Sequence, residues 1–254
     1  MVIAYEKNRS EEVNRLVKII LINGSPRKYG WSFELLVAAE KGVIDAGGEA
    51  EIIHLIDYTI KPCIGCVSDD QMACKFPCVI KDDDFNKIGE KILESNGLII
   101  ATPLYWYSVS GILKNFIDRM TSFENMIYHI SKSLVDGKVA GFIAVGNDTG
   151  AIMAIAYLMA TLNSMGFHIP PWALAYHHSV DDVLNNRSAV LDAYNVGYNV
   201  TIAASRFKDV DKWYRADIDV NNIVEEAKNR SNELRMSQKP FRDSIMYSKS
   251  EKKN

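Results

Sequence analysis

The chain has 254 residues, of which 48% are apolar and 24% are charged, so it can build a folded core and does not belong to the disordered class. Its formal net charge is −3, so the protein has no overall positive potential that would attract a polyanion. We therefore expect no nucleic-acid partner. No apolar run reaches the ~18 residues that span a bilayer, and the polar start lacks a signal-peptide pattern. The composition therefore predicts a cytoplasmic protein without a membrane partner.

Strand-like and helix-like segments alternate along residues 16–205. The predicted strands cover 16–22, 50–56, 97–101, 138–145 and 167–175, the last of them broken by Pro170 and Pro171. The predicted helices cover 32–46, 84–95, 109–126, 150–165 and 181–205. The strands are apolar throughout, which is typical of a parallel sheet that helices cover on both faces. We therefore predict an α/β fold with a doubly wound, five-stranded parallel sheet. In such sheets ligands bind beyond the carboxyl ends of the strands.

The composition changes near residue 206. Of the 49 residues from there to the end, 21 are charged, against 40 of the 205 before them, and this last segment carries a net charge of +3. We expect residues 1–205 to form one ligand-binding domain. Residues 206–254 are expected to form a charged C-terminal arm that is peripheral or partly disordered and packs on the domain or on a second subunit.

The loop after the first strand reads NGSPRKYGWS and covers residues 23–32. A small polar loop that opens a helix can bind a phosphate, because its amides and the helix N-terminus attract an anion. Ser25 and Ser32 add hydroxyl groups, and Arg27 adds a forked cation. The pattern is neither GxGxxG nor GxxxxGK[ST], which disfavours the usual dinucleotide fold and a P-loop NTPase. The alternative is an ordinary Gly-Ser-Pro turn with a solvated arginine and Ser32 as a helix cap.

The loop after the third strand places three aromatic residues close to the carboxyl end of that strand. Pro103 turns the chain out of the sheet, and Tyr105, Trp106 and Tyr107 follow at once. Such a rim suits a flat heteroaromatic ligand, although the same rings could form a plain core or subunit contact. In the helix that follows, we expect the neighbours Asp118 and Arg119 to form a structural or interface ion pair.

Together the two loops, GSPR with G-x-S and then P-L-Y-W-x-S-V-S-G-x-L-K-N-F-I-D-R, resemble the flavodoxin-like NAD(P)H-dependent FMN reductases and the related iron–sulfur flavoproteins. The resemblance covers about residues 17–176 and implies a flavodoxin-like fold that binds FMN. It assigns the FMN phosphate to the first loop and the isoalloxazine ring to the second and to the loop after the fourth strand. The implied cofactor-binding residues are Ser25, Arg27, Gly30, Ser32, Pro103, Leu104, Tyr105, Trp106, Tyr107, Asn147, Thr149 and Gly150. Trp31 departs from the family pattern, which has a small polar residue there.

All four cysteines of the chain lie within sixteen residues, at Cys63, Cys66, Cys74 and Cys78. A tight cluster without a signal peptide favours a metal, iron–sulfur or redox site over a secreted disulfide framework. Three interpretations stay open: a [4Fe–4S] cluster, free thiols or disulfides, and a zinc ion. The resemblance implies the cluster as a possible second cofactor, with the third ligand displaced by an insertion.

The resemblance implies an oxidoreductase in which FMN carries the chemistry, so we name no catalytic residue. The expected reaction passes reducing equivalents from NAD(P)H, the cosubstrate, through FMN to a flavin, a quinone or another small molecule. The alternative function is an iron–sulfur flavoprotein that carries electrons between protein partners. A third interpretation is a binding or regulatory module that has lost the cofactor. The family also implies a homodimer or homotetramer.

Overall fold

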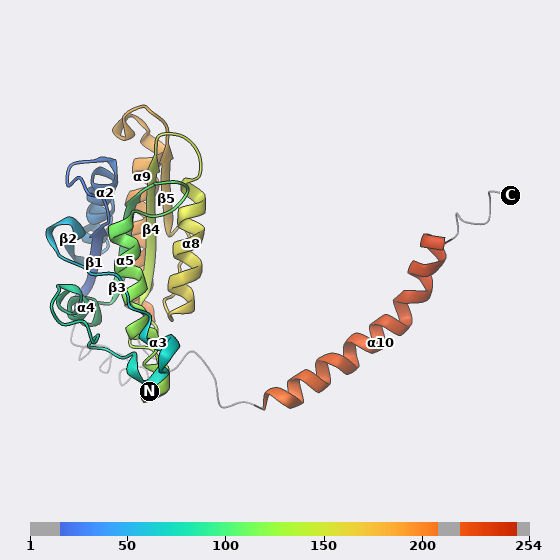
Figure 1. Cartoon of the computed structure of the whole chain (residues 1–254). Helices are drawn as coiled ribbons and strands as arrows, with labels where there is room; N and C mark the ends of the chain where they lie inside the picture. Colours follow the sequence, from blue (N-terminus) through green and yellow to red (C-terminus); the bar gives the residue numbers. More distant parts are fainter. Residues whose placement is uncertain (1–15, 208–218, 248–254) are drawn as a thin grey trace, which may run out of the picture. The chain divides into compact units, whose positions relative to one another are not determined.

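The structure is a computed structural model that describes residues 16–207 and 219–247 (Figure 1). The chain divides after Tyr214 into two units, which are described separately. The first unit contains the sheet, and the second contains one long helix.

Five parallel strands form the sheet of the first unit. They are β1 (Val17–Asn23), β2 (Gly48–His54), β3 (Gly97–Pro103), β4 (Val139–Gly146) and β5 (Leu174–His178), in the spatial order β2-β1-β3-β4-β5. This is the strand order of the flavodoxin-like sheets, in which the chain changes direction between β1 and β3. The predicted α/β fold with a five-stranded parallel sheet is confirmed.

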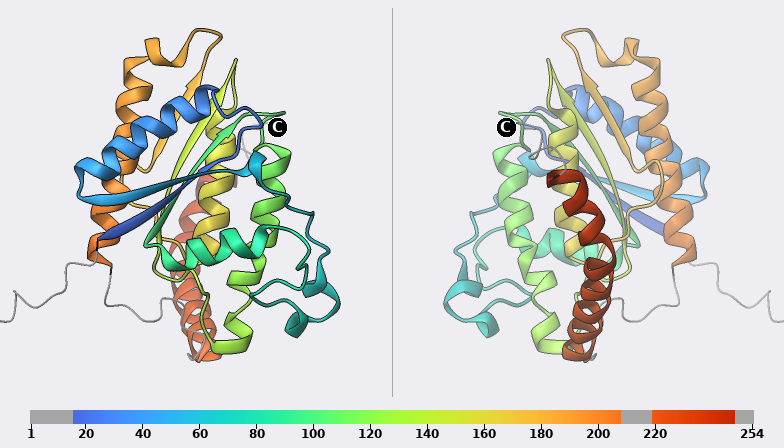
Figure 2. Two further views of the ribbon diagram at one scale, coloured as in Figure 1. Left: turned by 90° about the vertical axis from the view of Figure 1, so that its left-hand side faces the viewer. Right: turned by 90° about the vertical axis from the view of Figure 1, so that its right-hand side faces the viewer.

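Helices cover both faces of the sheet, as the continuous apolar strands require (Figure 2). One face packs against α2 (Trp31–Asp45) and α9 (Arg187–Arg206), and the other packs against α4 (Phe85–Glu94), α5 (Gly111–Arg119) and α8 (Ala151–Ser164). The shorter helical segments are η1 (Leu55–Asp57), α3 (Cys66–Asp69), η2 (Gln71–Ala73), α6 (Thr121–Glu124), α7 (Ile127–Ile130) and η3 (Val183–Asn185). Side chains of β1 alternate between the two faces. Ile19 and Leu21 lie in the core cluster on the side of α2 and α9, and Ile20 and Ile22 lie in the core cluster on the side of α4, α5 and α8.

Helices α2 and α9 pack with their backbones in direct contact. A Cβ atom on Gly197 would lie 1.9 Å from the Ala39 carbonyl oxygen, and one on Gly42 would lie 2.0 Å from the Tyr194 carbonyl oxygen. Both distances are far below van der Waals contact, so any larger residue would force the helices apart. The loop after β1 leads directly into α2. The contact between α2 and α9 therefore also fixes the end of that loop.

The structure shifts several predicted elements, among them the last predicted helix, which begins at Arg187 rather than at residue 181. The last strand begins at Leu174 rather than at residue 167, because Pro170 and Pro171 cannot donate to a neighbouring strand. His168 still accepts a hydrogen bond from the Ala140 amide at 2.8 Å before the chain leaves the sheet. The helix predicted over 109–126 is divided into α5 and α6, with α7 following.

The second unit contains α10 (Val220–Tyr247), a 28-residue helix with Pro240 inside it. Most of the side chains of α10 that the structure describes are exposed. The predicted arm is therefore helical over this range, while 208–218 and 248–254 lie outside the described residues. Its packing on the domain or on a second subunit stays a prediction. Among the helices of 16–207 and 219–247, none is both long and apolar enough to cross a membrane.

Candidate functional site

The loops that follow β1, β3 and β4 converge on one pocket of about 390 Å³. That volume lies within the range of small-molecule sites. The pocket sits at the carboxyl ends of the strands, and β1 and β3 are the neighbours between which the strand order reverses. Its lining consists of Ser25, Arg27, Gly30, Trp31, Ser32, Pro103, Leu104, Tyr105, Trp106, Tyr107, Val145, Gly146, Asn147, Asp148 and Thr149.

The first loop is held in shape by its own side chains. Asn23 is fully buried, and its amide group contacts the His54 ring at 2.9 Å while its oxygen accepts the Ser25 amide at 3.0 Å. The Ser25 hydroxyl in turn accepts the Arg27 amide at 3.1 Å. Gly30, not Ser32, is the N-cap of α2, and no side chain caps the helix. The first turn of α2 thus lines the pocket with its N-terminus uncapped by side chains, which favours an anion there.

Arg27 is the cation that this loop places at the pocket. Its side chain is exposed, and none of the ion pairs found among residues 16–207 and 219–247 involves it. The adjacent Lys28 is instead paired with Asp57 at 2.6 Å. The guanidinium of Arg27 is therefore available to bind a phosphate.

The aromatic loop after β3 is a tight turn. The Tyr105 amide donates to the Ser108 carbonyl at 2.9 Å, and the Ser108 amide donates back at 3.1 Å. Between them Trp106 and Tyr107 adopt φ angles of 50° and 65°, a region that costs energy for residues other than glycine. Trp106 is 95% exposed. The turn holds its rings at the mouth of the pocket instead of packing them in the core.

Hydrogen bonds beneath the pocket join the first loop to the aromatic loop. The Ser110 hydroxyl donates to the Gly24 carbonyl at 2.5 Å, and the Ser110 amide donates to the Thr102 hydroxyl at 3.2 Å. The Gly24 amide also donates to the Ala101 carbonyl at 2.8 Å. The buried side chains of Ser110 and Thr102 therefore fix the two loops relative to each other.

Eleven of the twelve residues that the sequence assigned to the cofactor line the pocket, and Gly150 is the exception. A Cβ on Gly150 would lie 2.6 Å from the Tyr107 ring, and its φ of 98° also favours glycine. Gly150 thus makes room for Tyr107. Sequence reasoning left two lining residues, Trp31 and Val145, without a role, and it assigned Gly146 and Asp148 only as part of the loop after the fourth strand. These residues lie within or beside the three loops, and that position in the sequence could have identified them.

The four cysteines lie together around a second, smaller pocket that the end of α5 also lines. All four are free thiols, with Cys63 exposed and Cys74 and Cys78 buried. Burial, together with the neighbouring Cys66, Cys78 and Cys63, raises the pKa of Cys74 to about 12. Such a thiol stays protonated unless a cation or metal compensates the charge of its thiolate.

The cysteines are not prearranged around a metal ion, whether zinc or iron. In the part of the chain that the structure describes, no group of three or more His, Cys, Asp or Glu side chains is arranged to hold a metal ion. A zinc ion requires four ligand atoms within about 2.3 Å of one point. A [4Fe–4S] cluster binds its four thiolates at separate iron atoms, so it needs a wider arrangement. The four free thiols around one pocket match that donor set in number and type.

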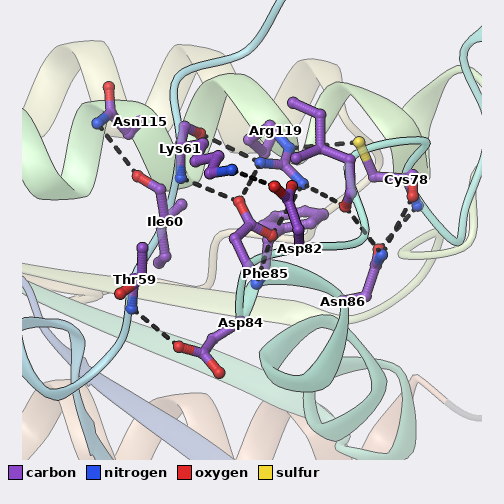
Figure 3. A network of polar contacts seen from close by, with 12 residues as sticks. Thr59, Ile60, Lys61, Cys78, Asp82, Asp84, Phe85, Asn86, Asn115 and Arg119 are labelled. Carbon is purple, nitrogen blue, oxygen red and sulfur yellow. Dashed lines mark hydrogen bonds and ion pairs between the residues drawn. The ribbon is translucent and has the colours of Figure 1, made fainter.

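The predicted pair between Asp118 and Arg119 is wrong. Consecutive residues of a helix point in different directions, so they do not face each other. Asp118 instead pairs with Lys114, one turn earlier, at 2.6 Å. Arg119 pairs with Asp83 at 2.6 Å, and both of these side chains are 0% exposed. Figure 3 shows Arg119 within the surrounding network of polar contacts.

The strand order and the pocket at its switch point place the protein among the flavodoxin-like α/β proteins. Residues 17–181 match the family described as NADPH-dependent FMN reductase. The chain belongs to this family, which confirms the resemblance.

Curated relatives carry two kinds of name. An iron-sulfur flavoprotein of Archaeoglobus fulgidus is 48% identical over 103 residues, which are 41% of this chain and 48% of that one. A second protein of that name from the same organism is 32% identical over 59% of this chain and 64% of that one. A candidate NAD(P)H-dependent FMN-containing oxidoreductase of Bacillus subtilis is 32% identical over 68% of this chain and 93% of that one. The chain thus spans about half to two thirds of the first two relatives.

Solved structures share the fold. RosB, with a bound riboflavin-phosphate intermediate, superposes with a TM-score of 0.63 at 20% identity, over 81% of this chain and 92% of that one. The NADH:FMN oxidoreductase EmoB gives a TM-score of 0.54 at 21% identity, over 77% of this chain and 92% of that one. At these identities the likeness concerns the fold alone.

Proposed function

We propose that the protein binds FMN in the pocket formed by the loops after β1, β3 and β4. It passes reducing equivalents from NAD(P)H through FMN to a small acceptor such as a flavin or a quinone. The observation that carries this proposal is the convergence of three loops at the β1/β3 switch point. The pocket combines a helix N-terminus without a side-chain cap, an arginine that forms no ion pair within the described part of the chain, and exposed aromatic rings. A phosphate joined to a flat heteroaromatic ring requires these features.

Each loop has a distinct role in this proposal. Ser25, Arg27 and Ser32 bind the phosphate, with the backbone of Gly30 close by. Pro103, Leu104 and the three aromatic residues hold the ring, while Asn147 and Thr149 border it from the β4 loop. FMN supplies the hydride and electron chemistry when bound, and the protein supplies position and electrostatics. No side chain of the chain is required as a general acid or base.

The remaining expectations belong to the same proposal. The enzyme works in the cytoplasm as a homodimer or homotetramer, and the flavin lies near the subunit boundary. The exposed ring of Trp106 supports a subunit boundary near the flavin. It is 95% exposed, and covering an apolar side chain with a ligand or a neighbouring subunit is energetically favourable.

Replacing Arg27 with alanine is expected to raise the dissociation constant of FMN about tenfold. A hydrogen bond between charged groups contributes about 1.5–3 kcal/mol, and the lower value applies to this exposed side chain. Fluorescence titration of the apoprotein with FMN measures the change. Riboflavin, which lacks the phosphate, should bind the wild type and the variant equally.

Lys28→Ala is the matched control. Lys28 follows Arg27 in the same loop but pairs with Asp57 and does not line the pocket. Its removal takes away the same charge and should leave the dissociation constant within about twofold. Equal weakening of FMN binding by both variants would show that the loop provides only a general positive field, and no effect of Arg27→Ala would exclude the phosphate role.

A second candidate function is favoured by the cysteines. Four free thiols line one pocket in this chain, and two relatives are named iron-sulfur flavoproteins. We propose that these thiols hold a [4Fe–4S] cluster and that the protein carries electrons onward to a protein partner. In that case the cluster and FMN occupy separate pockets of the same unit.

Anaerobic purification distinguishes the two functions. The double variant Cys63→Ala/Cys66→Ala removes the two cysteines that are not buried and leaves the buried pair in place. For a cluster-bearing carrier, wild-type protein should contain about four iron and four sulfide per chain, and the double variant should lose both. For a plain reductase, both proteins should lack iron and should oxidise NAD(P)H with an artificial acceptor at the same rate.

A further inference from the structure

Arg119, the last residue of α5, is the largest fully buried side chain of the described residues. Burying a guanidinium is costly unless every donor is used. Asp83 neutralises its charge through contacts at 2.6 and 3.3 Å. The carbonyls of Lys61 and Ile80 accept two further hydrogen bonds at 3.1 and 3.3 Å. The Phe85 ring covers the guanidinium at 4.6 Å from its centre.

The remaining donor of Arg119 points at a cysteine. Its Nε donates to the Sγ of Cys78 at 3.3 Å, as Figure 3 shows. A neutral thiol is a weak acceptor, whereas a thiolate is a strong one. The arginine thus directs an N–H group at a sulfur while Asp83 and two carbonyls hold it rigidly.

The backbone of Cys78 is fixed as well. Its amide donates to the Asn86 side-chain oxygen at 2.7 Å, and the Asn86 nitrogen donates back to the Cys78 carbonyl at 3.1 Å. The cysteine is therefore held by α4 through Asn86 and by α5 through Arg119. Both helices pack on the sheet, so this ligand position is attached to the core, in contrast to the exposed Cys63.

We propose that Arg119 is a positioning residue for the cluster. Arg119 holds the Cys78 sulfur in place and stabilises the reduced cluster through its N–H···S hydrogen bond. The inference rests on the proposed [4Fe–4S] site. Hydrogen bonds to the cysteine sulfurs withdraw negative charge and raise the reduction potential of such clusters. Arg119 therefore makes the cluster easier to reduce than it would be with the cysteines alone.

The test uses the full chain with FMN and a reconstituted cluster. Arg119→Lys keeps a positive charge beside Asp83 but removes the Nε–H donor. We expect unchanged iron and sulfide content, a cluster midpoint potential shifted to more negative values in a dithionite titration, and an unchanged flavin potential. Lys61→Gln is the control, because its side chain pairs with Asp82 at the surface and contacts no sulfur. It should leave the cluster potential unchanged.

A second measurement needs no variant. In wild-type protein labelled with ¹⁵N-arginine, pulsed EPR of the reduced cluster should detect nitrogen coupling from the Arg119 guanidinium. A cluster with the same potential in wild type and Arg119→Lys, or one without this coupling, would overturn the role of Arg119 alone. Wild-type protein that binds no iron and sulfide would overturn the cluster proposal itself, and with it this inference.

Discussion

Asp83→Ala is expected to lower the free energy of unfolding by about 3–5 kcal/mol, because it leaves the Arg119 guanidinium buried without a counter-charge. Both side chains are 0% exposed, so water cannot replace the lost carboxylate. Two backbone carbonyls keep their hydrogen bonds to the arginine but do not neutralise it. Urea unfolding followed by circular dichroism measures the loss.

Asp82→Ala is the matched control for this prediction. Asp82 precedes Asp83 in the chain but pairs with Lys61 at the surface, where an ion pair contributes at most about 1 kcal/mol. The two variants should therefore differ clearly in their unfolding midpoints. Coincident midpoints would mean that the pair between Asp83 and Arg119 is not what holds this region.

The effect of Asp83 should depend on pH. Burial opposes ionisation of Asp83, but hydrogen bonds from Arg119 and from the Lys61 and Phe85 amides outweigh it, so its pKa lies below the ordinary value. A carboxylate with a lowered pKa stabilises the fold above the pKa of the unfolded chain and loses this effect as the pH falls. The difference between wild type and Asp83→Ala should shrink below about pH 4.

Gly197→Ala is expected to destabilise the protein by about 3 kcal/mol or more. The new methyl group would lie 1.9 Å from the Ala39 carbonyl oxygen, which belongs to the backbone of α2 and cannot rotate away. The helices would have to separate, and the core cluster between them and the sheet would lose packing. In a unit of this size, the loss corresponds to a fall of about 6–12 °C in the melting temperature.

Gly111→Ala makes the same substitution where there is room. Gly111 begins α5, and a Cβ there has no atom within 4 Å. Alanine favours a helix over glycine by up to about 1 kcal/mol, so this variant should melt at the wild-type temperature or above it. If both alanine variants melted together, the close contact between α2 and α9 would not be the limiting feature.

The sequence predicted the sheet and the three pocket loops because both follow from local patterns. Apolar runs of strand length are easily recognised, and a parallel sheet brings the loops after its strands to one edge. Ser25 and Tyr105 could thus be assigned to one site although eighty positions separate them in the chain. Within the loops, glycine and proline further restrict the backbone.

The features that were missed depend on contacts between distant segments. Nothing local shows that Arg119 pairs with Asp83, which precedes a different helix. The close contact of Gly42 with α9 is equally invisible, because a glycine in a helix has no pattern of its own. The start of β5 was placed too early because the apolar run begins at residue 167, before Pro170 and Pro171 interrupt it, and the strand itself ends with His177 and His178.

The bonds that join the pocket loops are separate from the exposed side chains at the rim of the pocket. Hydrogen bonds among Ser110, Thr102 and Gly24 join the first loop to the aromatic loop. The lining residues Trp106 and Asn147 belong to neither core cluster. Substitutions of such exposed rim residues should consequently be tolerated by the fold. Related chains could diverge in ligand preference while keeping one scaffold, and the rim is the natural region in which to redesign specificity.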